Sequence, residues 1–331
     1  MDQYNSEITS AQTKSTGISS LYVLKTLCVF FVVVLHAPME GTSFVFLDVG
    51  VPCFFIISGY FLYNPDLTKV TQRVMKVAYK ALRLLLFLTA IYVLLGPPEG
   101  LPTTIPMVAR WLFVSIPSRY GGHLWYLVSL FWGLLAFRFY LWIFKGKGIH
   151  WLIIPAFFGL FIGRYRFLLD GSTASIFVLN FISYALPCLA IGYLARKWET
   201  VLKKYRAIDF AVVISICAYM ETVFVHFLSN GLPPMGPLLL TYPTAFAWFW
   251  VALQYKDFGK DSFIETVGRE HSARIYYWHP LFVWAFTVLD KNNISFGFQS
   301  FGAIYVFLAT LILSILIGLV SPYIRRLIKK K

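Results

Sequence analysis

A series of apolar segments, each about 17 to 25 residues long and nearly free of charge, constrains this chain more than any other feature. A helix needs about 20 apolar residues to cross the hydrocarbon core of a bilayer. Hydrophobic residues make up 58% of the 331 residues and charged residues only 13%, whereas a soluble domain has about 25% charged residues. The sequence therefore predicts an all-α, polytopic membrane helix bundle with about ten transmembrane helices. The predicted spans cover residues 20–37, 45–63, 80–96, 123–143, 150–168, 174–195, 207–228, 236–255, 272–290 and 300–324.

The lysines and arginines lie mostly in alternate loops between these segments, which indicates how the bundle is oriented. The positive-inside rule places these loops, and both termini, in the cytoplasm. The net charge of +14 then matches the anionic inner face of the membrane, and no nucleic-acid partner is predicted. We expect residues 1–17 to form a cytoplasmic tail and residues 18–331 a single multi-pass domain in the plasma (inner) membrane.

The first apolar segment carries both a lysine, Lys25, and a histidine, His36. Eleven positions advance a helix by three turns and about 20°, so the two side chains share one face with roughly 16 Å between them. His36 can act as a general base at neutral pH, or it can hydrogen-bond a carbonyl or a lipid headgroup at the helix end. Lys25 can bind an anion or extend its ammonium group toward the membrane surface.

A group of basic residues follows the second apolar segment at intervals of three, four and three positions, which places them on one face of a helix. They are Arg73, Lys76, Lys80 and Arg83. Such a stripe at the cytoplasmic boundary can bind the phosphates of a nucleotide-like donor. From charge alone, an anchor on anionic lipid is the simpler interpretation.

The seventh segment contains a carboxylate, Glu221, about fourteen positions from its start. A carboxylate at that depth in a membrane is a candidate functional residue. It could orient a histidine, bind a sugar hydroxyl or pair with an arginine.

Two aromatic motifs carry the remaining candidates. The first, GGHLWYLVSL, contains His123, Trp125 and Tyr126, and the second, ARIYYWHPLF, contains Tyr276 and His279. Aromatic belts at the membrane surface explain part of this composition. The second histidine precedes a proline, which frees backbone groups that tend to line a cavity. Ligand binding and structural packing both remain open for these residues.

Taken in order, the motifs resemble those of one family. A basic residue precedes a histidine in the first helix, and VPCFFIISGYFLY, a basic helix, HLWYL, a buried glutamate and YYWHPLF follow. This order is similar to that of the acyltransferase 3 family of integral membrane acyltransferases, across essentially the whole chain. The VPCFFIISGYFLY segment resembles the branch that includes enterobacterial common antigen O-acetyltransferases.

The resemblance implies an O-acetyltransferase that moves an acyl group from cytoplasmic acetyl-CoA, or another acyl-CoA, to a hydroxyl of an extracytoplasmic glycan or lipid-linked sugar. It implies that His36 is the catalytic histidine and that Lys25 stands where many members have arginine, so that the bidentate fork of arginine is lost. Acyl-CoA would be a substrate rather than a bound cofactor. The four cysteines lie in apolar segments without metal-ligand spacing, so no metal site is predicted.

These considerations assign three groups of site residues. His36 and Glu221 are the predicted catalytic residues. Lys25, Arg73, Lys80 and Arg83 are predicted to bind the donor. His123, Trp125, Tyr126, Tyr276 and His279 are predicted to bind the acceptor.

Two other classes of protein would use similar features. A transporter or flippase of a lipid-linked saccharide also needs buried charge and a basic inner face, but it predicts repeats of inverted topology, and none is recognisable in the sequence. A ligand sensor on the same scaffold would bind acyl-CoA without turnover. Protection against thermal unfolding by acetyl-CoA separates the transporter from the other two. The expected partners are acyl-CoA, the sugar acceptor and membrane lipids, and the sequence does not predict the oligomeric state.

Overall fold

The computed structural model describes residues 17–40, 46–96, 104–114, 121–172, 174–229, 236–292, 294 and 297–329, and within these residues it is all-helical. The predicted all-α fold is thereby confirmed. Residues 1–16 of the predicted tail lie outside this part of the chain. Five helices are long and apolar enough to cross a membrane, and two shorter apolar segments, Leu47–Leu62 and Ile149–Arg164, accompany them. The five are Ser19–His36, Leu67–Leu95, Gly122–Phe144, Ala207–Leu228 and Phe298–Val320. A total of about ten spans stays a prediction.

The helices follow one another with short connections. The first half of the chain forms α2 (Ser19–His36), η1 (Leu47–Val49), α3 (Gly50–Leu62), α4 (Leu67–Leu95), α5 (Ile105–Phe113), η2 (Gly122–Leu124), α6 (Trp125–Phe144), η3 (Ile149–Ile153), α7 (Ile154–Gly159), the π-turn η4 (Leu160–Arg164), α8 (Phe167–Asp170) and η5 (Ser175–Phe177). The second half forms η6 (Phe181–Ala185), α9 (Leu186–Lys197), α10 (Glu199–Leu202), α11 (Ala207–Leu228), α12 (Thr241–Gln254), α13 (Phe263–Thr266), η7 (Val267–His271), α14 (Ser272–Lys291) and α15 (Phe298–Lys329).

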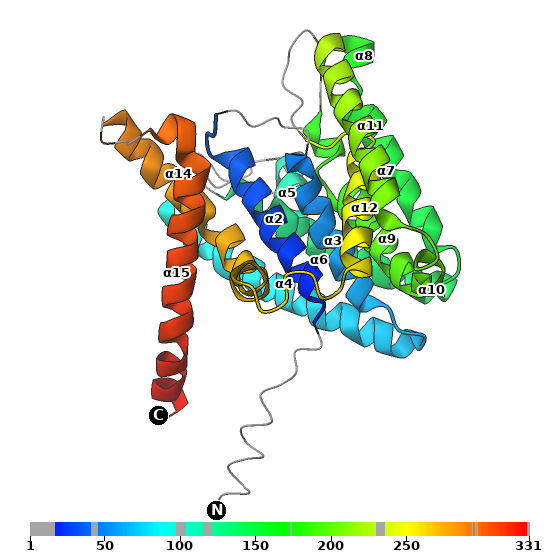
Figure 1. Ribbon diagram of the computed structural model, residues 1–331, viewed down its shortest axis with the longest axis horizontal. Helices are drawn as coiled ribbons and strands as arrows, with labels where there is room; N and C mark the ends of the chain where they lie inside the picture. The colour runs from blue at the N-terminus through cyan, green and yellow to red at the C-terminus, as the bar shows by residue number, and fades with distance from the viewer. Residues whose placement is uncertain are drawn as a thin grey trace, which may run out of the picture.

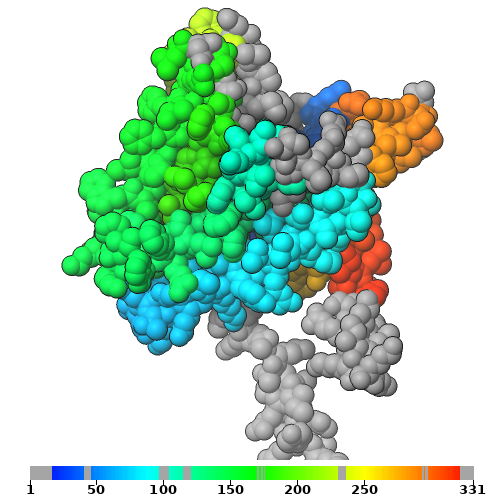
Figure 2. All heavy atoms as spheres, turned by 180° about the vertical axis from the view of Figure 1, so that it is seen from behind, coloured from blue at the N-terminus to red at the C-terminus, as the bar shows by residue number. Residues whose placement is uncertain are grey.

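Helix α4 is longer than the sequence predicts, because the basic segment before residue 80 belongs to the same helix. Asp66 caps its N-terminus by accepting a 2.8 Å hydrogen bond from the amide of Thr68. Apolar residues at helical spacing, beginning with Val70 and Val74, bury one face of α4 along its whole length. The basic first half and the apolar second half therefore pack against the rest of the protein as one continuous helix. Seen from behind, α4 crosses the lower part of the molecule, between the green body and α14 and α15 (Figure 2).

Helix α2 occupies the middle of the bundle, with α14 and α15 on one side and α3 and α12 on the other (Figure 1). Beside it, α3 and α9 approach each other closely enough for their backbones to touch. A Cβ atom on Gly59 would collide with the carbonyl oxygen of Leu189, and one on Gly192 would collide with that of Ile56. Small residues allow this kind of backbone approach between membrane helices.

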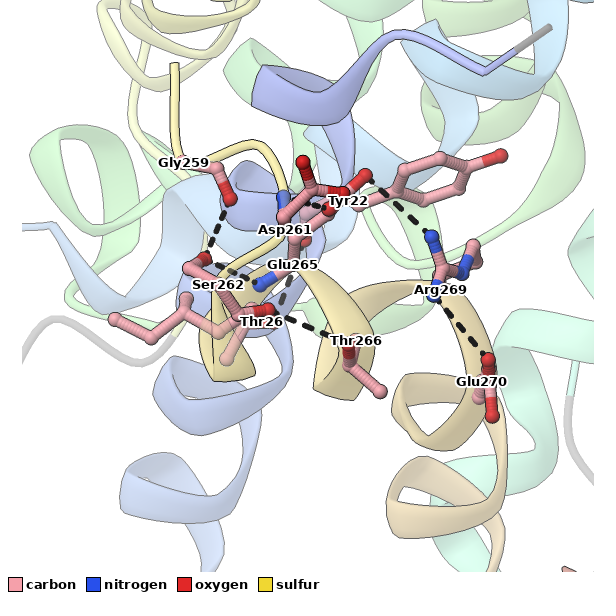
Figure 3. A network of polar contacts seen from close by, with 10 residues as sticks. Tyr22, Thr26, Gly259, Asp261, Ser262, Glu265, Thr266, Arg269 and Glu270 are labelled. Atoms are coloured by element: carbon pink, nitrogen blue, oxygen red, sulfur yellow. Dashed lines mark hydrogen bonds and ion pairs between the residues drawn. The ribbon is translucent and has the colours of Figure 1, made fainter. Parts of the chain in front are cut away.

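The N-terminal half of α2 is fixed by a polar network from α13 and η7 (Figure 3). The hydroxyl of Thr26 donates a 2.7 Å hydrogen bond to the carbonyl of Ile264. Ser262 caps α13 by accepting from the amide of Glu265, whose buried carboxylate accepts from the amide of Asp261 at 2.8 Å. Because this network holds α2 against the short helices, the position of Lys25, one residue before Thr26, is fixed as well.

The two ends of the described chain point the same way. Helix α2 begins, and α15 ends, toward the lower edge of Figure 1. That arrangement is compatible with both termini on one side of a membrane, and the assignment of this side to the cytoplasm stays a prediction.

Candidate functional site

His36 lies at the C-terminal end of α2, where its imidazole is exposed although its helix neighbours Val33, Val34 and Ala37 are buried. Its Nδ1 atom is 2.7 Å from the carbonyl oxygen of Val32. Because a carbonyl only accepts hydrogen bonds, this contact assigns the proton to Nδ1. The neutral ring then presents the lone pair of Nε2, which is the atom that a general base needs.

His279 faces His36 from α14, with the two ring centroids 5.0 Å apart. The His279 side chain is fully buried, and its Nδ1 atom is 2.8 Å from the carbonyl oxygen of Tyr276, so its proton is assigned to Nδ1 as well. Its Nε2 atom is buried and has no hydrogen-bond partner. The ring of His36 therefore packs against a second, buried imidazole on α14.

His123 completes the group from η2, with its ring centroid 5.4 Å from that of His279 and 4.9 Å from that of Tyr92. The hydroxyl of Tyr276 donates to the backbone carbonyl of His123, and this bond joins η2 to α14. We call His36, His123 and His279 the histidine cluster. Within the described residues, no group of three or more histidines, cysteines and carboxylates is placed to hold a metal ion.

Aromatic side chains surround the histidine cluster. The ring of Tyr126 packs 5.3 Å from that of Tyr276 and 4.6 Å from that of Phe55, and Trp125 packs edge-on against Tyr184 at 5.4 Å. Four of the predicted acceptor-binding residues, His123, Tyr126, Tyr276 and His279, are thus joined by ring contacts, whereas the Trp125 ring packs against Tyr184. Tyr92, which sequence reasoning did not select, belongs to the same region through its ring contact with His123, although only its position in an apolar helix could be seen beforehand.

Lys25 and Lys80 form the basic part of the site. Lys25 is half-buried, its ammonium lies 5.4 Å from the ring centroid of Tyr22, and it is close enough to Lys80 for the two charges to act on each other. Neither lysine forms an ion pair with a carboxylate of the described residues. Arg83 is exposed on the same helix as Lys80 and lies over the ring of Tyr79. Adjacent cations without a counter-ion favour an anionic ligand.

Arg73 lies apart from this pair, at a cavity of about 630 Å³. Its guanidinium donates a 2.7 Å hydrogen bond to the carbonyl of Tyr63. The cavity is also lined by Arg196, Lys203 and Lys256.

Glu199 is the centre of that cationic group, and sequence reasoning did not select it. Its carboxylate, 11% exposed, accepts from the Tyr60 hydroxyl at 2.9 Å and pairs with Lys256 at 3.0 Å, Lys203 at 3.2 Å and Arg196. Burial alone opposes the charged form, but the hydrogen bonds from Lys256, Tyr60 and Lys203 and the charge of Arg196 outweigh it, and the pKa of Glu199 falls to about 2. We call these five residues the Glu199 cluster, in which every charge has a partner.

Glu221 is not hydrogen-bonded to the histidine cluster. Its carboxylate accepts a 2.5 Å hydrogen bond from the Tyr165 hydroxyl and a 2.9 Å bond from the amide of Leu240, immediately before α12. The Tyr165 hydroxyl in turn accepts from the amide of Leu239 at 3.1 Å. These contacts give Glu221 a structural role at the start of α12. None of them supports a catalytic role.

A comparison with protein families identifies the family of this chain. A family model described as an acyltransferase domain matches residues 18–321, which is most of the chain. The chain therefore belongs to the acyltransferase 3 family, whose members are membrane acyltransferases. Among curated proteins and among solved structures, nothing matches the chain.

Proposed function

We propose that this family member is an O-acetyltransferase of the plasma membrane that transfers the acetyl group of cytoplasmic acetyl-CoA to a hydroxyl of an extracytoplasmic or lipid-linked glycan. The observation that carries the proposal is the state of His36. Its Nδ1–H is held by the Val32 carbonyl, so the Nε2 lone pair is free, and the ring is exposed among buried neighbours. An imidazole in this state can take a proton from an acceptor hydroxyl.

In the proposed reaction, Nε2 of His36 removes the proton of the acceptor hydroxyl while the oxygen attacks the thioester carbonyl. The tetrahedral intermediate then collapses, the carbon–sulfur bond breaks, and the CoA thiolate takes the proton from the imidazolium. The products are an O-acetyl ester and CoA, and His36 returns to its neutral form. No covalent acyl-enzyme is required for this balance.

The donor is expected to enter beside Lys25. The charges of Lys25 and Lys80, which pair with no carboxylate in the part of the chain that the structure describes, attract the phosphates of the donor, together with Arg83 on the same helix as Lys80. Because Lys25 and His36 lie on one helix eleven positions apart, roughly 16 Å of extended pantetheine arm would follow α2 toward the imidazole. Arg73 lies at the cavity that Glu199 also lines, and it is hydrogen-bonded to the carbonyl of Tyr63. It can therefore contact the donor only at the edge of this path.

The test is label transfer by the purified protein in proteoliposomes, with radioactive acetyl-CoA and a glycolipid extract from cells that lack the protein. We expect His36→Ala to bind acetyl-CoA, seen as protection against thermal unfolding, but to lose at least 100-fold in transfer rate. The matched control is His150→Ala, an exposed histidine of η3 outside the cluster. A folded His36→Ala variant that transfers acetyl at the wild-type rate would disprove the proposal.

A further inference from the structure

The cavity of about 630 Å³ beside Arg73 carries far more positive than negative charge. Of the described residues that line it, five are cations and one, Glu199, is a carboxylate. The cations are Arg73, Arg196, Lys197, Lys203 and Lys256. One carboxylate cannot neutralise five cations, so an excess of four positive charges faces this space. Its volume is typical of small-ligand sites, which measure about 300–1,000 Å³.

The cavity lies at one end of the helix bundle. Helix α3 ends at Leu62, α9 at Lys197 and α12 at Gln254, and α4 begins at Leu67. The lining residues come from the ends of these helices, from α10 and from the segments that follow them. Lipid headgroups and water both lie at the ends of membrane helices. An anion from either source can therefore reach the excess charge.

Contacts within the protein keep the walls of the cavity in place. The guanidinium of Arg73 donates to the carbonyl of Tyr63, and the ring of Tyr63 packs 5.0 Å from that of Tyr193. Next to these tyrosines, α3 and α9 are in backbone contact at Gly59 and Gly192. Because no ligand is needed for these contacts, the cations are held in position beforehand, which lowers the entropic cost of binding.

Two of the five cations are free to bind a ligand. Arg196, Lys203 and Lys256 share the carboxylate of Glu199. Arg73 and Lys197, which are both exposed, pair with no carboxylate of the described residues. A guanidinium has five N–H donors and an ammonium group three, so both side chains keep donors for an anion. Phosphate oxygens are the acceptors that such groups bind most strongly.

A second cavity, of about 280 Å³, adjoins the first. The two share four lining residues: Tyr63, Arg73, Arg196 and Lys256. The same cations therefore face both spaces, so a ligand with two anionic groups can occupy both at once. Two phosphate groups carry about two to four negative charges, which matches the excess of positive charge.

We propose that the two cavities form a second anion site, separate from Lys25 and Lys80, that binds a ligand with two phosphate groups. The headgroup of an anionic lipid and a soluble diphosphate present the same chemistry to this site. Arg73 and Lys80 both lie on α4, but seven positions separate them by about 10 Å along the helix. The site goes beyond the proposed reaction and does not depend on it.

The first test measures thermal unfolding of the full-length protein in a neutral detergent, with pyrophosphate added at constant ionic strength. Pyrophosphate should stabilise wild type in a saturable manner. Arg73→Gln/Lys197→Gln should need at least about tenfold more pyrophosphate for the same effect, because two charge-assisted contacts are lost. A wild-type response in this variant would overturn the proposal.

The matched control is Lys76→Gln/Lys204→Gln. It removes the same charge at two exposed lysines that line neither cavity, so it should respond as wild type does. A loss as large as that of Arg73→Gln/Lys197→Gln would reduce the effect to net charge and overturn the site. If Arg73→Gln prevents folding, Lys197→Gln alone decides: it should weaken binding about threefold or more, and an unchanged response would refute the proposal.

Two further variants test the charge and the place of the site. Glu199→Gln removes the carboxylate from the cavity, so pyrophosphate should bind several-fold more tightly; weaker or unchanged binding contradicts the proposal. Lys25→Ala should keep the wild-type response. If it instead loses the response, pyrophosphate binds at the donor lysines, and the separate site is overturned.

The lipid is tested in nanodiscs of phosphatidylcholine with and without cardiolipin, whose headgroup carries two phosphates. Stabilisation by cardiolipin that Arg73→Gln/Lys197→Gln loses would identify a lipid headgroup as the ligand. Stabilisation by pyrophosphate alone would identify a soluble diphosphate. Stabilisation by neither would overturn the proposal. Because none of these readouts uses acetyl transfer, a protein that binds pyrophosphate but transfers no acetyl would refute the proposed function and support this site.

Discussion

The Glu199 cluster and the histidine cluster both place polar side chains in the helix bundle, but they differ in how fully those side chains are bound. Every oxygen of Glu199 has a donor, from Tyr60 or from one of three cations. In the histidine cluster, His279 keeps a buried Nε2 atom without any partner, and His36 presents its Nε2 at an exposed position. A saturated network stabilises a structure, whereas unsatisfied groups that persist in a buried site indicate ligand binding or chemistry. Removing a side chain should therefore cost stability in the first cluster and activity in the second.

The largest effect is expected for His279→Leu. Leucine removes a buried ring nitrogen that has no partner but also the Nδ1–H bond to the Tyr276 carbonyl, so the two effects offset each other and the thermal unfolding temperature should change little. Transfer of labelled acetyl should fall by about 100-fold or more, because the imidazole beside His36 is lost. A strongly destabilised variant with normal turnover per folded molecule would show that His279 is a packing residue, and the comparison would fail.

The opposite result is expected for Glu199→Gln. The glutamine leaves Lys203 and Lys256 without their carboxylate, and since these lysines are partly exposed the loss should be only about 1–2 kcal/mol of stability. Turnover at saturating acetyl-CoA should remain within about twofold of wild type. Thermal unfolding in detergent gives the first quantity and label transfer the second. A large fall in turnover without a change in unfolding temperature contradicts the structural role.

Substitution of Lys25 sharpens the comparison at the donor end. Lys25→Ala removes a cation that pairs with no carboxylate of the described residues, so it should raise the KM for acetyl-CoA about tenfold and leave kcat nearly unchanged. Lys25→Arg keeps the charge and should stay near the wild-type KM. Equal KM values for all three proteins would exclude Lys25 from the donor site.

The smallest effect concerns pH. The folded-state pKa of Glu199 is about 2 and the ordinary value is 4.5, so the carboxylate adds stability above about pH 4.5 that is lost as the pH falls toward 2. The difference in unfolding temperature between wild type and Glu199→Gln should therefore be constant from pH 8 to about pH 5 and shrink below that range. A difference that grows with acidification has the wrong sign.

The sequence predicts the helices well because their apolar periodicity is local. Helical residues occur within every predicted span, although residues 150–168 and 174–195 each contain several short segments instead of one long helix, and α4 begins at Leu67, before its predicted span. His36, His123 and His279 were each predicted as site residues, but their ring contacts with one another were not predicted. Nothing local in the sequence indicates that residues 36 and 279 touch.

The missed residues depend on contacts between distant segments. Glu199 contacts Tyr60 and Lys256 at sequence separations that no helical repeat encodes. The depth of Glu221 within its apolar segment suggested a catalytic role, but in the structure its carboxylate accepts a hydrogen bond from the Tyr165 hydroxyl. One available signal was overlooked: glycines within apolar helices, such as Gly192, mark where another helix approaches closely.

The close approach at Gly59 and Gly192 has a mechanical consequence. Two backbones in contact cannot slide past each other or separate without opening a void, so α3 and α9 should move together as one rigid unit. His279 lies on α14, outside that unit. Any motion that admits substrates should therefore shift α14 and α15 relative to α3 and α9, without bending either of these two helices.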